Sequence, residues 1–307
     1  MAFRTLEIAH PAELHIRSGQ LCIEQESGTA VVPLEDIATI VCLGSGIRIS
    51  TMAMSMLCEN EITMLMLDTK YMPSGVLHAY DANARQSLVM RNQISLPELR
   101  ANEAWRQLIH TKIMNQSRAL SILGLDGVEE VAGYAARLTG ETPVTCEMIE
   151  AAEAAAARVY FQYFYPGLNR RTDDPMNSHL NYGYAVLRSA LIRALAAAGF
   201  LQALGLHHSS QLNSFNLADD VIEPWRPMVD LIAHGNVDAN VMLSRKQRKE
   251  LAHVLHNACM IEGKKMTILS AIDIMIETLR NFVLDEGWQK LTLPVILPVE
   301  SAELVNE

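Results

Sequence analysis

The sequence lacks the patterns of several common classes of protein. It contains no glycine-rich P-loop or dinucleotide-binding pattern, so chemistry driven by nucleotide binding is not expected. Its five cysteines are scattered and none forms a Cys-x-x-Cys pair, which argues against a zinc site and favours reduced thiols. The N-terminus has no apolar core of the signal-peptide type, and Glu59 and Glu61 interrupt the methionine-rich run 51–67. We therefore expect a cytoplasmic protein with no membrane segment.

Positive charge is also scarce for a protein that would bind nucleic acid. The chain has 25 Lys and Arg against 35 Asp and Glu, a formal net charge of −10. Dividing it after Met90 leaves an excess of acidic residues in both parts, so neither part is a basic module. This balance argues against DNA binding by bulk charge and favours local basic patches, a bound metal or a basic partner.

The hydrophobic pattern changes character along the chain. Up to about residue 67, short runs rich in Ile, Leu and Val alternate with His-Pro and Ser-Gly turns, which is typical of strands in a small sandwich. From Trp105 onward, apolar residues recur at helical spacing. The predicted fold is α+β. We expect a small N-terminal β-sandwich domain over 1–90, a larger all-α domain over 91–295, in which we also expect a metal site, and a flexible tail over 296–307.

The segment Gly205–Asp230 combines histidines with carboxylates. His207 and His208 leave a Gly turn, while Asp220 and Glu223 are three apart and share a face if the segment is helical. Imidazole and carboxylate ligands together suit a hard or borderline divalent cation. The alternative is a solvated acidic helix end with ordinary loop histidines, because acidic residues near a helix N-terminus also favour the helix dipole.

Glu153 lies deep in a predicted helix, among the alanines 154–157. A carboxylate on an alanine-rich stripe that faces the core needs a partner or a cation. The alternative is a helix whose acidic stripe, with Glu147 and Glu150, faces water. The residues alone leave both interpretations open.

Separated segments of the chain, in this order, resemble the CRISPR-associated spacer-acquisition endonuclease/integrase family. Lys112–Gln116 is similar to a family signature. Glu153 followed by Ala-Arg-Val-Tyr-Phe at 157–161 resembles the family's third metal-ligand segment, with Ala154 where Gly is frequent. Residues 181–184 match a further segment, and the Gly-x-x-His turn with the Asp-x-x-Glu spacing of 220–223 resembles the rest of the metal site. Residues 213–227 are most similar to the branch that accompanies single-protein effectors of the Cas-nine type.

The resemblance implies the chemistry and the residues that carry it. It implies a prokaryotic, metal-dependent DNA endonuclease and integrase with Mg²⁺ or Mn²⁺ held by Glu153, His208 and Glu223. Asp220 would hydrogen-bond a water on the metal or orient His208. The Gly-x-x-His register selects His208, although His207 could exchange roles with it. The family joins the 3′ hydroxyl of a captured DNA fragment to a repeat array and also cuts or resolves branched DNA.

The resemblance also implies partners. They are double-stranded and branched DNA, a second copy of the chain in a homodimer, a small companion CRISPR-associated adaptation protein dimer, and a possible contact with the effector nuclease. We assign dimerisation and partner contacts to the N-terminal domain. The candidate DNA-binding side chains are all basic: Lys112, Arg188, Arg245, Lys246, Arg248 and Lys249. Two alternatives stay open, a non-catalytic structural or adaptor DNA-binding protein and a metal-dependent phosphoesterase acting on small molecules.

Overall fold

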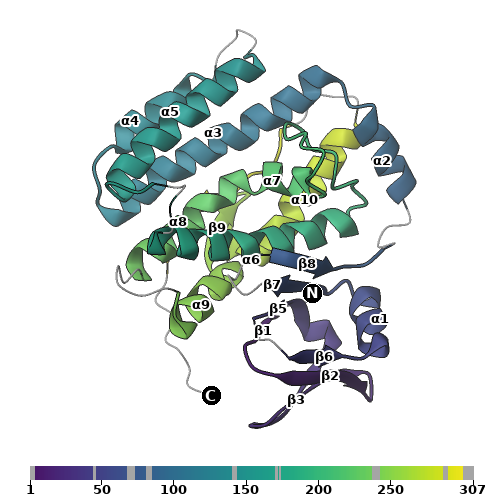
Figure 1. The fold of residues 1–307 in the computed structure, drawn as a ribbon. Helices are drawn as coiled ribbons and strands as arrows, with labels where there is room; N and C mark the ends of the chain where they lie inside the picture. The colour runs from purple at the N-terminus through teal and green to yellow at the C-terminus, as the bar shows by residue number, and fades with distance from the viewer. Residues whose placement is uncertain are drawn as a thin grey trace.

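A computed structural model describes most of the 307 residues. The described ranges are 4–43, 46–67, 73–80, 85–139, 144–169, 172, 174–236, 243–285 and 290–299. A β-rich N-terminal region and a larger helical region lie one against the other (Figure 1). In the described part of the chain, no helix is long and apolar enough to cross a membrane.

The described residues of the N-terminal region form eight strands, one short helix and a 3₁₀ turn. They are β1 (Arg4–Ile8), β2 (Ala12–Arg17), β3 (Gln20–Gln25), β4 (Gly28–Pro33), η1 (Leu34–Asp36), β5 (Ile37–Cys42), β6 (Ile47–Ile49), α1 (Thr51–Glu59), β7 (Thr63–Leu67) and β8 (Pro73–Leu77). One sheet has the strand order β1-β5-β7-β8 and the other β4-β3-β2-β6. Apolar residues of both sheets, including Leu14, Leu21 and Ile40, form a single core. The predicted β-rich region is thereby confirmed.

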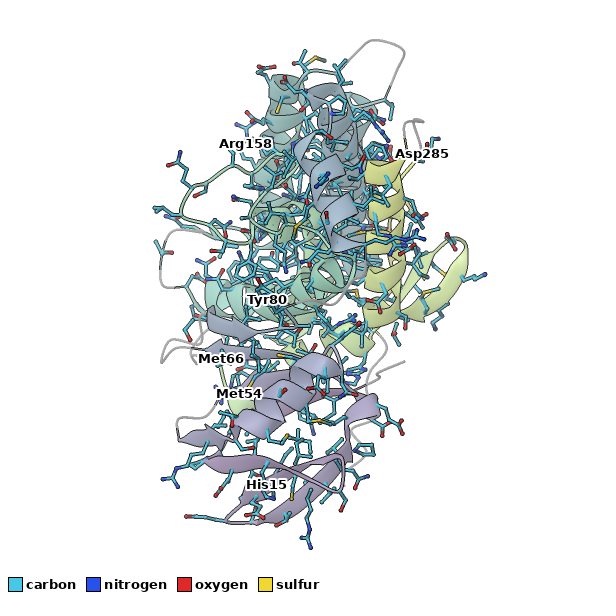
Figure 2. The ribbon with its side chains drawn as sticks, turned by 90° about the vertical axis from the view of Figure 1, so that its right-hand side faces the viewer. His15, Met54, Met66, Tyr80, Arg158 and Asp285 are labelled. Carbon is cyan, nitrogen blue, oxygen red and sulfur yellow. The ribbon has the colours of Figure 1, made fainter. Side chains whose placement is uncertain are left out.

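The sheet β1-β5-β7-β8 has a second face that belongs to the helical region. Strand β5 is buried along its whole length, and Ala38 on it is part of the helical core. Helix α6 (Pro175–Ala197) contacts β5 and β7. The two regions therefore pack against each other along this sheet. In Figure 2, His15 and Met54 mark the β-rich region, and Arg158 and Asp285 lie on opposite sides of the helical region.

The helical region is built around α3 and α6. The helices of this region besides α6 are α2 (Gln86–Ile94), α3 (Glu98–Leu123), α4 (Val128–Ala136), α5 (Cys146–Phe164), α7 (Asn216–Val221), η2 (Glu223–Trp225), α8 (Arg226–Asn236), α9 (Arg245–Ala252), η3 (His253–His256) and α10 (Ile268–Leu284). Thr145 caps the N-terminus of α5, and its side chain accepts a hydrogen bond from the Met148 amide. The last helix, α10, buries one face, which includes Ile272, Met275 and Leu279.

Helices α6 and α8 pack closely against each other. A Cβ on Gly183 would lie 2.4 Å from Val229, so only glycine permits this packing. Helix α6 is buried along most of its length, with Leu180, Leu187 and Leu191 inaccessible to solvent. The elements α7, η2 and α8, which follow α6, also contact α3.

Two details of the helical region differ from the prediction. It is not all-α, because β9 (Ala258–Ile261), β10 (Lys264–Thr267) and β11 (Val295–Ile296) form a sheet with the order β10-β9-β11. These strands are too short to show a clear alternation in sequence. The expected tail also starts later than residue 296, because Ile296 is fully buried in β11. Residues 300–307 lie outside the described part of the chain.

Candidate active site

Three elements distant in sequence meet at one buried ammonium group. Lys112 comes from the middle of α3, Glu153 from α5 and Glu223 from the start of η2. Lys112 Nζ lies 2.5 Å from Glu153 Oε1 and 2.5 Å from Glu223 Oε2. The first contact is also a hydrogen bond, whereas the second is an ion pair without hydrogen-bond geometry. Two of the predicted ligands thus face the same point, which a cation already occupies.

Glu223 is held in its ionised form by two cations. Its side chain is 6% exposed, and Arg226 Nε donates to Oε1 at 2.9 Å. Burial alone would raise the pKa of Glu223, but the charges of Arg226 and Lys112 outweigh it and lower the pKa. Burial would likewise lower the pKa of Lys112, and Glu223 and Glu153 reverse this and raise it. The result is a charged network in the protein interior, and such a network needs every member to be paired.

Asp220 organises the turn that carries the histidines. Its fully buried carboxylate accepts hydrogen bonds from the amides of Leu206, His207 and His208, at 2.6, 3.1 and 3.1 Å. A Cβ on Gly205 would lie 2.6 Å from Asp220 Oδ2, so this compact turn requires glycine. The turn and α7 are therefore fixed to each other by one carboxylate.

The same carboxylate orients His208. The Nδ1 of His208 lies 2.6 Å from Asp220 Oδ1, which leaves Nε2 for another ligand. This hydrogen bond raises the pKa of His208 in spite of partial burial, and the charges of Asp220 and Glu223 add to the effect. A carboxylate on one nitrogen and a metal on the other is a common arrangement for histidine ligands. Orienting His208 is one of the two roles that the resemblance implies for Asp220, and its part in a metal site stays a prediction.

The side chain of His207 contacts Trp105 and helix α5 instead of Asp220. Its ring stacks on Trp105 at 4.5 Å with an interplanar angle of 7°, and its nitrogens approach Cys146 and Glu150 of α5. The ring of Trp105 also meets His208 edge-on at 5.8 Å. The adjacent histidines therefore have separate surroundings, and only the side chain of His208 is bound to Asp220.

The predicted DNA-binding residues are scattered. Lys112 lies in the ion network described above, and Arg188 pairs with Asp219 on α7 at 2.6 Å. On α9, Lys246 and Lys249 are exposed, and Arg248 donates to the Leu243 carbonyl at 2.8 Å. The side chain of Arg245 lies outside the described part of the chain. A role in binding DNA stays a prediction for all of them.

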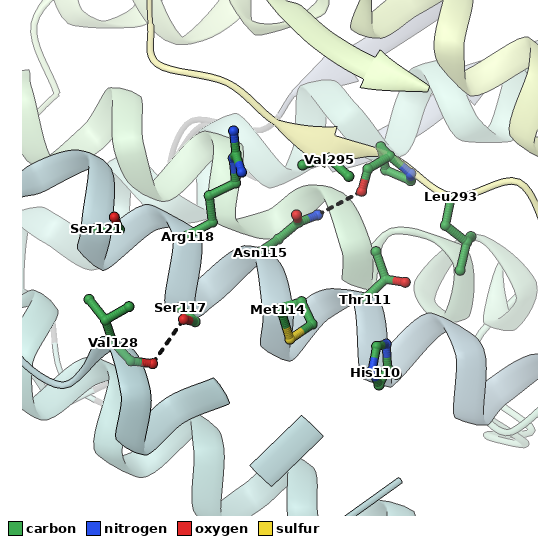
Figure 3. Close-up of a pocket in the computed structure, with 11 residues that line it drawn as sticks. His110, Thr111, Met114, Asn115, Ser117, Arg118, Ser121, Val128, Leu293 and Val295 are labelled. Atoms are coloured by element: carbon green, nitrogen blue, oxygen red, sulfur yellow. Dashed lines mark hydrogen bonds between the residues drawn. The ribbon is translucent and has the colours of Figure 1, made fainter. Parts of the chain in front are cut away.

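A pocket of about 480 Å³ lies along α3, and none of the predicted metal ligands lines it. Figure 3 shows Asn115 on its wall donating to the Pro294 carbonyl, at 3.1 Å, and Ser117 donating to Val128, at 2.9 Å. Arg118, also in its wall, donates to the Ile296 carbonyl. The Asn115 and Arg118 contacts fasten the C-terminal strand to α3, and Asn115 also donates to the Pro224 carbonyl, next to Glu223, at 2.8 Å.

Several residues near the site escaped the sequence analysis. Arg226 stands three positions after Glu223, so helical spacing was the signal that could have identified it. Its guanidinium also lies over the Tyr184 ring, 4.7 Å from the centroid. Cys146 and Trp105 gave no signal as site residues, because their contacts with His207 span long stretches of sequence.

The donor types suit a divalent cation, although the ligand atoms of Glu153, His208 and Glu223 do not all lie within 4.8 Å of one another in this structure. Two carboxylates on either side of a single ammonium, together with a free imidazole nitrogen on an oriented ring, offer oxygen and nitrogen ligands of the kind that suit Mg²⁺ and Mn²⁺. Since an ammonium stands between the carboxylates, they already face a centre of positive charge. Such a site suits chemistry on phosphate esters, where negative charge must be neutralised.

Comparison with known proteins places this geometry in a family. The sequence model described as CRISPR associated protein Cas1 matches residues 7–260. The CRISPR-associated endonuclease Cas1 of Neisseria meningitidis serogroup C (strain 8013) is 35% identical, over 98% of each chain. Among solved structures, a casposase bound to integration product superposes with a TM-score of 0.76 at 18% identity, covering 95% of this chain and 92% of that one. A Cas6-RT-Cas1–Cas2 complex gives a TM-score of 0.70 at 18% identity, covering 92% of this chain and 35% of the other.

Proposed function

The chain belongs to the CRISPR-associated Cas1 family, and from this premise we propose that it is a metal-dependent DNA endonuclease and integrase. Its action would insert captured DNA fragments into a CRISPR array in antiviral defence, and it would also cut or resolve branched DNA. The observation that carries the proposal is the meeting of Glu153 and Glu223 at one cation, with the charge of Glu223 acting on a histidine that Asp220 orients.

The proposed ligands are Glu153, His208 through Nε2, and Glu223. A bound Mg²⁺ or Mn²⁺ would neutralise charge on the reacting phosphate and activate a hydroxyl or water. Arg226 keeps Glu223 ionised, and Asp220 fixes the tautomer and direction of the His208 ring. Lys112 balances the carboxylates before a divalent cation arrives, which keeps the site assembled in the metal-free protein.

The joining reaction is a phosphoryl transfer. The oxygen of a DNA 3′ hydroxyl forms a bond to a target phosphorus, the bond from that phosphorus to the target's own 3′ oxygen breaks, and the leaving oxygen takes up a proton. With water in place of the hydroxyl, the same step cuts the strand. Proteins of this kind gain most of their rate from positioning and charge stabilisation, which a preorganised network of buried ions provides.

We extend the proposal to partners. The similar casposase was solved bound to an integration product, and another similar structure contains both Cas1 and Cas2. These two likenesses support double-stranded and branched DNA as substrates and a small companion protein dimer as a partner. A homodimer, with the N-terminal region 1–90 supplying dimer and partner contacts, is part of the same proposal. It would let the DNA path run across several subunits, which suits a chain of net charge −10.

The test compares wild type with Glu153→Gln on branched DNA and on a 3′-hydroxyl fragment with a target duplex, in Mn²⁺, Mg²⁺ or chelator. We expect wild-type activity only with metal and at least about a 100-fold loss in Glu153→Gln, because a metal ligand is removed while the helix is kept. Glu147→Gln, on the same helix but exposed, is the matched control. Full activity in chelator or in Glu153→Gln would overturn the metal mechanism, and activity only on a small chromogenic phosphoester would favour the phosphoesterase alternative.

A further inference from the structure

A second group of metal-ligating side chains lies beside the proposed active site. Cys146 and Glu150 are one turn apart on α5 and face His207 from the turn after Gly205. Cys146 Sγ lies 3.4 Å from His207 Nδ1 and 3.9 Å from Glu150 Oε1, and His207 Nε2 lies 3.5 Å from the same carboxylate oxygen. Each residue offers a donor atom within 4.8 Å of the others.

These separations suit a small tetrahedral ion. With zinc bonds of about 2.0–2.3 Å, neighbouring ligand atoms lie roughly 3.3–3.8 Å apart. Cys146 contacts Nδ1 of the His207 ring and Glu150 contacts Nε2, so one ion would take a single ring nitrogen, and all three donor atoms then lie within 4.8 Å of one another. A rotation of the exposed Glu150 side chain would bring them around one ion. This cluster brings sulfur, nitrogen and oxygen donors together. A surface cluster with only one kind of donor atom would not favour a particular metal.

The histidine of this cluster is held in place before any ion binds. Its ring lies flat on Trp105, which is 1% exposed and fixed in the core of the helical region. Its backbone amide donates to Asp220 at 3.1 Å. The two α5 ligands stand in the first turns of a helix that Thr145 caps. Preorganised ligands lose little conformational entropy when an ion binds.

The donor types distinguish this cluster from the proposed active site. A thiolate with an imidazole and one carboxylate favours Zn²⁺, while the carboxylate-rich active site favours Mg²⁺ or Mn²⁺. Glu150 is 55% exposed, so an ion can arrive from solvent and a water can complete the coordination. The absence of a Cys-x-x-Cys pair does not exclude such a site, because its ligands come from two distant segments.

We propose that Cys146, Glu150 and His207 form a zinc site that is separate from the active site. On binding, the Cys146 thiol releases its proton and the thiolate, the His207 ring and the Glu150 carboxylate become ligands. The ion ties α5 to the turn after Gly205. Because α5 also carries Glu153 and the turn also carries His208, zinc would fix the spacing between these two elements.

The first experiment titrates Co²⁺, as a spectroscopic substitute for Zn²⁺, into the metal-stripped full-length protein. We expect a thiolate-to-cobalt charge-transfer band with one ion per chain, abolished by Cys146→Ser, weakened at least about 10-fold by His207→Gln, and displaced by Zn²⁺. Cys58→Ser, which changes another half-buried thiol, is the matched control and should keep the band. Glu153→Gln should keep it too, which separates this site from the active site.

A second measurement needs no substitution. Alkylation of wild-type Cys146 by iodoacetamide, followed by mass spectrometry, should be slowed at least about 10-fold by micromolar Zn²⁺ and not by Mg²⁺, since a bound thiolate is protected. Cys58 is the internal reference. A missing cobalt band, a band that survives in Cys146→Ser, or alkylation of Cys146 that zinc does not slow would each overturn the zinc site. None of these readouts depends on DNA cleavage, so failure here leaves the proposed function untouched.

Discussion

The β-rich region and the helical region differ in what their cores contain. Among the described residues, the first buries only two polar side chains, Thr39 and Thr63. The second buries polar and charged side chains throughout, among them Lys112, Asp220 and Glu223. Buried charges destabilise a fold unless they are paired. The contrast indicates that the first core serves stability alone and that the second also serves chemistry.

Buried charged groups of the helical region have hydrogen-bond partners away from the candidate site as well. Asp230 accepts hydrogen bonds from Tyr160 at 2.9 Å and from Tyr184 at 2.5 Å. Arg100 donates to the carbonyls of Phe282 and Asp285 at the end of α10. Hydrogen-bonded buried groups favour one defined arrangement of their side chains, which is what a set of ligands needs.

The largest expected effect on stability comes from the apolar core. Leu14 is inaccessible and lies where the two sheets meet, so Leu14→Ala should lower the free energy of unfolding by about 3 kcal/mol. Chemical denaturation measures the loss. Because no ion network is involved, the affinity for Mn²⁺ should stay the same in the folded protein.

A control sharpens this test. Val31 on β4 is 50% exposed, so Val31→Ala should change stability by less than about 0.5 kcal/mol. If Leu14→Ala changed the dissociation constant for Mn²⁺, the two cores would be coupled and the comparison above would fail.

A smaller loss, of a different kind, is expected at the ion network. Lys112→Met removes the ammonium between Glu153 and Glu223 and should cost about 2 kcal/mol without metal, less than a fully uncompensated buried charge, because Arg226 remains. The variant should bind Mn²⁺ at least about 10-fold more tightly, since no resident cation competes. Saturating Mn²⁺ should then restore its stability more than that of wild type.

Calorimetric titration of Mn²⁺ and thermal unfolding with and without the ion measure both quantities. Lys112→Arg keeps a cation at the position and serves as the control, with affinity close to that of wild type. Weaker binding of Mn²⁺ by Lys112→Met would show that Lys112 supports the bound ion and does not compete with it.

The sequence predicted the local features of this site better than its long-range contacts. The three-residue spacing of Asp220 and Glu223 indicated one helix face, yet Pro224 follows directly and Glu223 starts the 3₁₀ turn η2. Asp220 therefore serves the histidine turn while Glu223 faces Lys112. Local propensities do not reveal which of two carboxylates turns to which partner.

The need of Glu153 for a partner was predictable, but the partner was not. An alanine-rich stripe indicated a helix that approaches its neighbours closely, and the structure places Lys112 of α3 there, 41 residues earlier in the chain. A lone lysine in a helix is usually exposed, and only the tertiary fold shows that this one is 8% exposed. The third sheet was missed for a related reason, because strands as short as β11 are defined by their pairing with β9.

The smallest expected effect on stability concerns exposed charges, which complete the comparison. Lys246 and Lys249 lie on α9 of the helical region and are exposed, and Lys246 has only a loose ion pair with Glu250 at 3.8 Å. Changing both to Gln should alter the free energy of unfolding by less than about 0.5 kcal/mol. If they bind DNA phosphates, the affinity should weaken and the slope of log K against log salt should fall by about 0.9 for each phosphate that is no longer neutralised.

The matched control is Arg17→Gln with Arg48→Gln, which removes the same charge from exposed positions of the β-rich region. Fluorescence anisotropy with a labelled duplex at several salt concentrations gives the slopes. An unchanged slope in the α9 variant would remove these lysines from the DNA path, and an equal change in the control would show that overall charge, and not the position of α9, sets the affinity.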